Sequence, residues 1–240
     1  MIFSVIVPVH NAGKYIEELL SSIDDERKSL EGSLSGNEVS DPSIELLLME
    51  NGSSDNSAEL CRLFSENHSY ARSFELGPVG AYNARREGIR RAKGDYLVFA
   101  DADDLLAKDM LISLKDALSQ FKAPPDILLY NAAMSDAPKE PIFSFPFDRD
   151  RLYEGAALRA FYEVMCSNDS LNALWNKCVK RTTALAALED GEFDNLNHGE
   201  DLIQTAAFLD KATSVAYTDR IFYLYRQNPD GLTAGYHESR

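Results

Sequence analysis

The sequence has few residues that could form cross-links or anchor it in a membrane. Its three cysteines, Cys61, Cys166 and Cys178, include no CxxC pair, which argues against a disulfide framework and a cysteine-rich zinc site. No stretch approaches the roughly 20 apolar residues that a membrane-spanning helix needs. The apolar start, residues 1–8, lacks the basic segment of a signal peptide and predicts a first strand. We therefore expect a cytoplasmic protein, with peripheral association at the inner face of a membrane left open.

Basic residues are also scarce. The chain has 24 Lys and Arg against 39 Asp and Glu, for a formal net charge of −15. Because nucleic acid is bound through clustered Lys and Arg, it is not an expected partner. A diphosphate ligand would need a cation to bridge it to such an acidic protein. With 45% hydrophobic residues over 240 positions, the chain can bury the core of one large globular domain. Oligomeric state is left open.

Apolar runs of strand length alternate with helical patterns four times along the first half of the chain. This order predicts an α/β fold with a mostly parallel central sheet and helices on both faces. Continuous apolar runs are typical of strands that are covered on both sides. The predicted strands are 3–7, 44–49, 72–76 and 96–100, and the predicted helices are 15–23, 57–66, 79–91 and 108–121.

The alternation fades after a strand at 127–130, where five prolines fall between positions 124 and 146. Further on, the pattern predicts a helix at 155–166, another at 201–209, and an aromatic strand at 221–225. Residues 24–43 are rich in Ser, Gly, Asp and Glu without periodic apolar positions, which predicts an exposed insertion. No linker divides the chain, so we expect one domain over 1–240.

Three carboxylates follow the fourth predicted strand. Side chains of an extended segment alternate, so Asp101 and Asp103 should share one side, while Asp104 faces the other way or caps the next helix. Oxygen-only ligands favour Mg²⁺ or Mn²⁺, and Mg²⁺ is usually held by one or two carboxylates together with substrate phosphates. The cluster thus indicates a metal-bound diphosphate; the alternative is a solvated acidic loop.

Other polar residues follow the first and second strands. In open α/β sheets, ligands bind beyond the carboxyl ends of the strands, so these loops and the Asp cluster should converge on one rim. The residues concerned are Pro8, His10 and Asn11 after the first strand, and Glu50 and Asn51 after the second.

Five segments along the chain form a recognisable set: SVIVPVHN at 4–11, ENGSSD at 50–55, residues 80–104, WNK at 175–177 and GED at 199–201. Together they resemble the motifs of inverting family 2 glycosyltransferases, which have the Rossmann-like GT-A fold. The resemblance implies transfer of a sugar from a nucleoside diphosphate sugar, normally a UDP-sugar, to a hydroxyl of a glycan or lipid-linked acceptor, as in polysaccharide biosynthesis. It also implies a Mn²⁺ or Mg²⁺ cofactor, a nucleotide-sugar half (1–131) and an acceptor half (132–240).

The resemblance assigns roles to particular residues. It implies Asp201 as the general base, Asp103 as the metal ligand assisted by Asp101, and an acceptor site with Trp175 and Glu200. The donor-binding residues that it implies are Pro8, His10, Asn11, Glu50, Asn51, Arg85 and Asp101.

Several of these positions have alternative interpretations. The family usually has Asp at both positions 50 and 51. The Asn51 carboxamide oxygen can still accept a hydrogen bond from a pyrimidine N–H, but the group adds a donor. Arg85 could orient acidic residues or approach the diphosphate. Glu200, the rival base, and Asp201 could simply begin a helix, where acids favour the macrodipole. Trp175 could be a core residue, and His198 could tune the site.

Two other protein classes compete with an active glycosyltransferase. One is a protein of the same fold that holds a nucleotide sugar without transferring it, which only the altered pair at 50 and 51 supports. The other is a sugar nucleotidyltransferase. That enzyme should show a glycine-rich basic loop after the first strand, whereas residues 9–14 contain one Gly and one Lys.

Overall fold

The structure, a computed structural model, describes residues 1–33, 44–190 and 199–228. Their strands form one sheet of ten, in the order β3-β2-β1-β4-β9-β6-β10-β5, with β7 beside β6 and β8 beside β10. The strands are β1 (Phe3–Val9), β2 (Ile44–Glu50), β3 (Ala71–Glu75), β4 (Tyr96–Phe99), β5 (Leu105–Leu106), β6 (Ile127–Met134), β7 (Ala137–Pro141), β8 (Leu152–Glu154), β9 (Lys177–Lys180) and β10 (Ser214–Tyr225).

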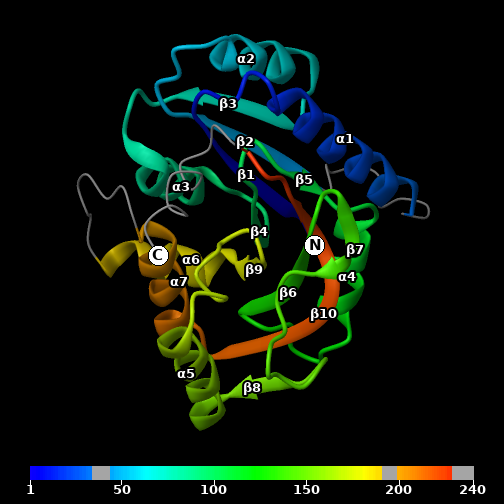
Figure 1. Ribbon diagram of the computed structural model, residues 1–240, viewed down its shortest axis with the longest axis vertical. Helices are drawn as coiled ribbons and strands as arrows, with labels where there is room; N and C mark the ends of the chain where they lie inside the picture. The colour runs from blue at the N-terminus through cyan, green and yellow to red at the C-terminus, as the bar shows by residue number, and fades with distance from the viewer. Residues whose placement is uncertain (34–43, 191–198, 229–240) are drawn as a thin grey trace.

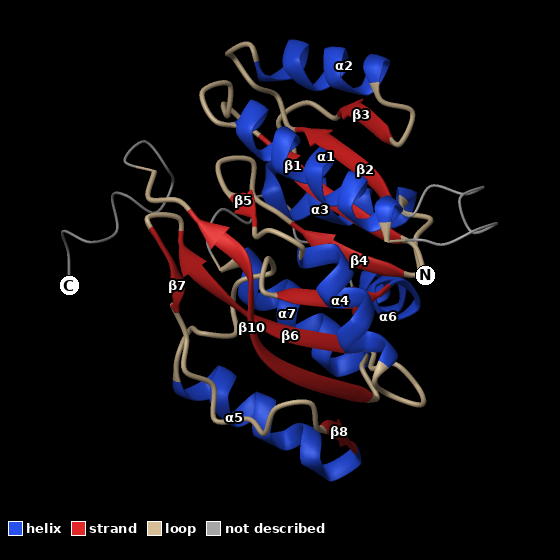
Figure 2. Ribbon diagram, turned by 90° about the vertical axis from the view of Figure 1, so that its right-hand side faces the viewer, coloured by secondary structure: helices blue, strands red, loops and turns tan. Residues whose placement is uncertain are grey.

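Helices lie on both faces of this sheet (Figure 2). They are α1 (Ile16–Gly32), α2 (Ser57–Asn67), α3 (Gly80–Arg91), α4 (Met110–Ser119), α5 (Arg159–Ser167), α6 (Arg181–Ala187) and α7 (Glu200–Lys211), with the short 3₁₀ turns η2 (Gly155–Leu158) and η3 (Leu188–Asp190).

Most of the sheet runs in one direction. β1 is parallel to β2 and β4, and β2 is parallel to β3. β9 runs antiparallel to both of its neighbours, so β6 has the direction of β4, and β10 is parallel to β6. The predicted α/β fold with a mostly parallel sheet is confirmed, but the reversed strand β9 was not predicted.

The continuous apolar runs in the sequence are explained by the burial of both faces of the sheet under helices. Along β1, Val5 and Val7 pack with α1, α2 and α4, whereas Ile6 packs on the opposite face with α3 and α7. The fit is closest at Gly88, where an added Cβ would lie 2.5 Å from Ile6 Cγ2. Glycine at this position lets α3 approach β1 closely, which places Arg85, about one turn earlier, near the end of the sheet.

The prediction of an exposed insertion at 24–43 is wrong for its first part, since α1 continues to Gly32. Ile23 and Leu30 extend the buried stripe, and Glu26 is buried with them. The Glu26 carboxylate accepts hydrogen bonds from Asp109 N (2.6 Å) and Leu111 N (2.9 Å), so an acid that resembles a surface residue in the sequence holds the start of α4. Positions 34–43 lie outside the described residues.

The segment after the Asp cluster also differs from its prediction. Residues Leu105–Leu106 form β5, which pairs with the end of β10, and α4 starts only at Met110 with Asp109 as its N-cap residue. Asp104 therefore does not cap a helix. The expected strand at 221–225 is the end of the longer β10, which curves around the lower part of the molecule (Figure 1) and shifts register between Tyr217 and Tyr223.

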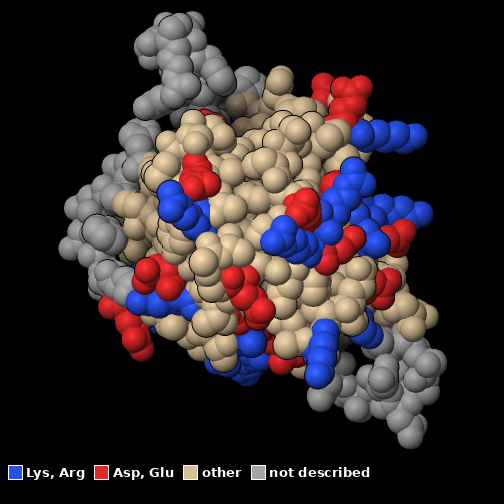
Figure 3. Space-filling view, turned by 90° about the horizontal axis from the view of Figure 1, so that it is seen from below, with Lys and Arg blue, Asp and Glu red and all other residues tan. Residues whose placement is uncertain are grey.

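Surface charge does not single out a binding face in the view from below. Among the described residues drawn in Figure 3, acidic and basic side chains are interspersed. Within the same residues, no helix combines the length and apolar character needed to cross a bilayer.

Candidate active site

The loops after β1 and β2 meet at the carboxyl ends of these strands. Asn51 N donates to Val9 O (2.8 Å), and His10 Nδ1 lies 2.9 Å from Asn51 O. Asn11, in the left-handed region at φ 50°, receives a hydrogen bond from Ser54 N at its Oδ1 (2.8 Å). His10 and Asn11 are exposed, and Pro8 is partly exposed within β1. The predicted meeting of these two loops is confirmed.

Glu50 and Asn51 hold the turn that follows β2. Both are buried, and Glu50 Oε1 accepts from Ser53 N at 2.5 Å. Asn51 Oδ1 accepts from Val79 N (2.8 Å) and Gly80 N (2.9 Å) at the start of α3, so both lone pairs of that oxygen are used. The oxygen predicted to read a base thus supports the N-terminus of α3 instead.

Arg85 connects two carboxylates that are far apart in sequence. Its Nη1 donates to Asp201 Oδ1 at 2.6 Å, and its Nη2 donates to Asp101 Oδ1 at 2.8 Å. The Arg85 side chain is 5% exposed, whereas Asp101 and Asp201 remain 32% and 28% exposed. One buried guanidinium from α3 therefore joins the loop after β4 to the first turn of α7. Charge-assisted hydrogen bonds of this kind are among the strongest in proteins.

The ionisation of this cluster follows from burial and pairing. Burial raises the pKa of the Asp201 carboxyl above its ordinary value, against the opposing attraction of Arg85. Burial disfavours the charge on Arg85, but Asp201 and Asp101 more than offset it and raise the Arg85 pKa. Glu200 adjoins Asp201 in the first turn of α7 and is partly exposed. His198 lies outside the described residues.

The Asp cluster divides as predicted, but in a turn rather than in the extended segment that the prediction assumed, since Asp104 N donates to Asp101 O (3.1 Å). Asp101 and Asp103 are partly exposed, whereas Asp104 is buried. Asp104 accepts hydrogen bonds from Tyr223 Oη and from Arg226 N, each at 2.7 Å. Burial, with the nearby charge of Asp101, raises the pKa of Asp104 to about 8. Tyr223 Oη also accepts from Asp101 N (2.9 Å), so β10 supports the cluster from behind.

Asp103 contacts the last described segment of the chain. Its Oδ2 accepts a hydrogen bond from Asn228 Nδ2 at 2.8 Å. Among the described residues, no group of three or more His, Cys, Asp or Glu is placed to hold a metal ion. Asp101 and Asp103 still suit Mg²⁺ or Mn²⁺, because such ions are commonly held by one or two carboxylates with ligand phosphates completing the shell.

Lys177 is a buried basic residue for which the sequence predicted no role of its own beyond membership of the WNK segment. Its Nζ donates to Leu171 O (2.7 Å), Asn176 Oδ1 (2.7 Å) and Ala173 O. Burial lowers the pKa of Lys177 to about 7, while the negative charge of Asp201 acts in the opposite direction. The WNK segment itself is the only signal in the sequence that could have pointed to this lysine. Lys177 ties the loop before β9 into a fixed turn.

Trp175 lies in a stack of aromatic rings behind the site. Its ring is 5.9 Å from that of Phe143 and 4.9 Å from that of Tyr223, the latter nearly parallel at 5°. Only 9% of the residue is exposed. The structure thus places the indole in the core that backs the Asp cluster, in keeping with the alternative interpretation of this residue.

The fold and the rim define an α/β protein of the class whose ligands bind beyond the carboxyl ends of a largely parallel sheet. Within this class, residues 4–168 match the family model described as Glycosyl transferase family 2. The chain belongs to this glycosyltransferase family, as its motifs indicate.

Relatives of known name are similar over most of the chain. Streptococcus pneumoniae glycosyltransferase GlyG is 24% identical over 235 residues, which cover 96% of this chain and 72% of GlyG. The uncharacterized Escherichia coli glycosyltransferase YibD is 26% identical over 237 residues, covering 92% of this chain and 60% of YibD.

The fold is similar to that of several solved structures. S. aureus TarS 1-349 in complex with UDP-GlcNAc has a TM-score of 0.70 at 20% identity, covering 98% of this chain and 61% of that one. The Pyrobaculum calidifontis mannosyltransferase PcManGT, in complex with GDP-Man and Mn²⁺, has a TM-score of 0.56 at 18% identity, covering 97% and 59%. This chain spans only 31% of S. pneumoniae GlyA. We therefore treat the activity, substrates and partners of the whole protein as proposals.

Proposed function

We propose that this chain transfers a sugar from a UDP-sugar to a hydroxyl of a glycan or lipid-linked acceptor, with inversion at the anomeric carbon. The observation that carries the proposal is the Arg85 bridge. It brings Asp101, from the loop predicted to hold the donor, and Asp201, predicted to act on the acceptor, to one guanidinium. The bridge supports an inverting transfer because it places the proposed base close to the donor loop, and the incoming hydroxyl must attack the anomeric carbon on the face opposite the leaving diphosphate.

Asp201 is the proposed general base. As the acceptor oxygen attacks the anomeric carbon, Asp201 takes the proton of the hydroxyl, and the bond from that carbon to the diphosphate oxygen breaks. A raised pKa suits this role, because a base works best when its pKa lies near the operating pH. Arg85 keeps the carboxylate ionised and oriented, and Glu200 contacts the acceptor beside it.

The donor half, 1–131, would hold the nucleotide against the loops after β1 and β2. His10 is exposed and could stack on the base, and Pro8 and Asn11 would line the same pocket. Because Asn51 Oδ1 is already used, we propose that the Asn51 amide N–H reads a carbonyl of the pyrimidine rather than its N–H. Asp103 and Asp101 would hold Mn²⁺ or Mg²⁺, which when bound neutralises charge on the leaving diphosphate.

The donor site is tested by calorimetric titration with UDP, GDP, CDP and dTDP, each with Mn²⁺ and again with a chelator. We expect metal-dependent binding of UDP and weaker binding by Asp103→Asn. Asp116→Asn is the matched control, because Asp116 is an exposed acid of α4. The absence of binding to all four nucleotides would contradict the proposed donor site.

The base is tested by release of UDP from UDP-sugars in the presence of acceptor glycans. Asp201→Asn should lower turnover by about 10²–10⁴-fold, the usual contribution of a general base, with nucleotide binding nearly unchanged. Glu200→Gln is the comparison variant. Full turnover by Asp201→Asn would refute the assignment, and loss confined to Glu200→Gln would move the role to Glu200. Nucleotide binding without any transfer by the unmodified chain would favour the non-catalytic alternative.

A further inference from the structure

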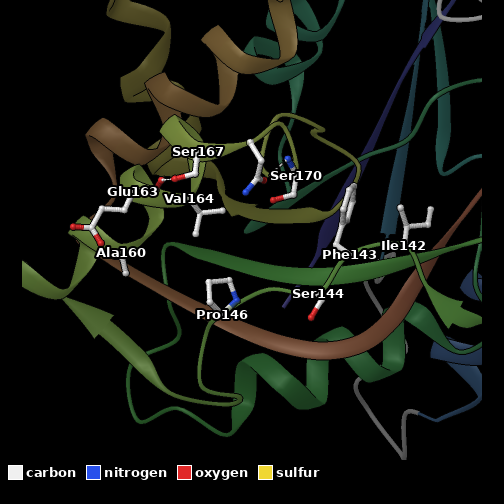
Figure 4. A pocket seen from close by; sticks show the side chains of 10 residues that line it. Ile142, Phe143, Ser144, Pro146, Ala160, Glu163, Val164, Ser167 and Ser170 are labelled. Carbon is white, nitrogen blue, oxygen red and sulfur yellow. Dashed lines mark hydrogen bonds between the residues drawn. The ribbon is translucent and has the colours of Figure 1, made fainter. Parts of the chain in front are cut away.

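A hollow of about 710 Å³ lies between α5 and the segment 142–146, in the half of the chain that follows β6 (Figure 4). The α5 side contributes Val164 and Ser167, and the opposite side contributes Ser144 and Pro146. Its volume lies within the range of about 300–1,000 Å³ that is usual for pockets that bind small molecules. None of these residues belongs to the rim that carries the Asp cluster.

The lining combines apolar and hydroxyl-bearing side chains. Phe143, Pro146 and Val164 give apolar surface. The hydroxyl of Ser144 can donate and accept, whereas that of Ser167, which donates to Glu163 O, can still accept. Asn168, Ser170 and Glu163 add amide, hydroxyl and carboxylate groups. A saccharide has the complementary surface, with apolar C–H faces for the ring of Phe143 and hydroxyls around its edge. An alkyl chain would leave the polar groups unmatched.

The hollow is connected to the reaction centre through stacked rings. Phe143, in its wall, stacks on Trp175, and Trp175 stacks on Tyr223. Tyr223 in turn bonds to Asp101 N and to Asp104. The loop that continues from Ser170 also contacts α7, because Thr205 Oγ1 donates to Asn172 O at 3.0 Å. Two walls of the hollow are therefore linked to β10, which supports the Asp cluster, and to α7, which carries Asp201.

We propose that this hollow is an acceptor subsite that binds sugar units of an oligosaccharide beyond the unit whose hydroxyl reacts. The proposal rests on the proposed function, since it supposes a glycan acceptor. It assigns segment 142–146 and α5 to selection of the acceptor, and it gives Trp175 an indirect part, as the ring behind Phe143.

The experiment is a titration of the whole chain, without nucleotide, with tri- to hexasaccharides of glucose, galactose and N-acetylglucosamine. The readout is fluorescence of Trp175, which is the single tryptophan and stacks on the pocket residue Phe143. The blocking variant is Ser167→Tyr, which fills the hollow. The matched control is Ser119→Tyr on α4. Both serines are exposed near a helix end and bond to the carbonyl four residues earlier, at 2.5 Å for Ser167 and 2.7 Å for Ser119.

We expect at least one oligosaccharide to give a saturable change in fluorescence, weakened roughly tenfold or more by Ser167→Tyr because contacts in the hollow are lost. Ser119→Tyr should bind like the unmodified chain. No response to any saccharide, or equal binding by both variants, would overturn the subsite. Calorimetric titration with UDP separates this failure from failure of the proposed function: retained UDP binding leaves the donor site standing, and its absence in the unmodified chain removes both.

Discussion

Replacement of Arg85 with methionine removes the one charge that joins Asp101 to Asp201. Methionine keeps a long unbranched side chain, so loss of packing is small and loss of charge dominates. Two carboxylates 2.8 and 2.6 Å from the guanidinium would then face each other without compensation. We expect a less stable fold. We also expect a higher pKa for Asp201, because in the unmodified chain the attraction of Arg85 opposes the rise that burial causes.

The expected loss of stability in Arg85→Met follows from how deeply the ion pairs of Arg85 are buried. Removing one partner of a fully buried ion pair costs about 3–5 kcal/mol. Because Asp101 and Asp201 retain 32% and 28% exposure, water compensates them in part, and we expect the lower end, about 3 kcal/mol. For a chain of this length that corresponds to a fall of roughly 6–12 °C in Tm.

The assay is urea and thermal unfolding of Arg85→Met, Asp201→Asn and the double variant. We expect Arg85→Met to cost about 1–2 kcal/mol less when Asp201 is already Asn, because contacting residues are coupled. Arg86→Met is the matched control: Arg86 is equally buried in α3 but donates to Leu188 O (2.8 Å) and Tyr82 Oη (3.3 Å) rather than to carboxylates. Equal losses for the two arginines, with no coupling to Asp201, would refute the reasoning.

Three further variants test the surroundings of the site. The pKa of Asp104, raised from 3.8 to about 8, means that the folded chain holds a proton that the unfolded chain has lost, so stability should fall as pH rises through this window. Asp104→Asn should flatten that slope in urea unfolding measured from about pH 5 to 8; an unchanged slope would contradict it. Lys177→Met removes a charge that lowers the Asp201 pKa, so the acidic limb of the pH–rate profile should move to higher pH. An unmoved limb would leave Lys177 with a purely structural role. Gly52 has φ +70°, and an added Cβ would lie 2.8 Å from Pro78 N, so Gly52→Ala should lower the free energy of unfolding by about 1–3 kcal/mol. Gly77→Ala, with φ +71° but open space around it, is the control that separates the clash from backbone strain.

Much of the donor side could be predicted from local pattern. The run at 96–100 is apolar at every position and the run at 3–7 at every position except Ser4. Such runs form strands covered on both faces, which the structure confirms. The sequence also predicted that Asp104 turns away from Asp101 and Asp103, although the structure achieves this with a turn rather than by strand alternation. These results depend on neighbours within a few residues, where the geometry of one strand or helix decides the outcome.

Other features lay beyond local pattern. Glu26 looks like a surface acid until α4 is placed against α1, where it accepts two backbone hydrogen bonds. β9 is a short run, Lys177–Lys180, that gains its place only by pairing with β4 and β6 at once. Asn51 stands where the family usually has Asp, and only the structure shows that its side-chain oxygen accepts hydrogen bonds from backbone groups at the start of α3.

The sequence by itself determined the class of fold, the family and the order of the polar loops, because periodicity and motifs are written in consecutive residues. Only the tertiary structure decided that Arg85 would hold Asp101 and Asp201 together and that Asp104 would be buried against Tyr223. Ion pairing and burial depend on distances between segments about a hundred residues apart, and those distances exist only once the sheet has brought β4, α3, α7 and β10 to one end.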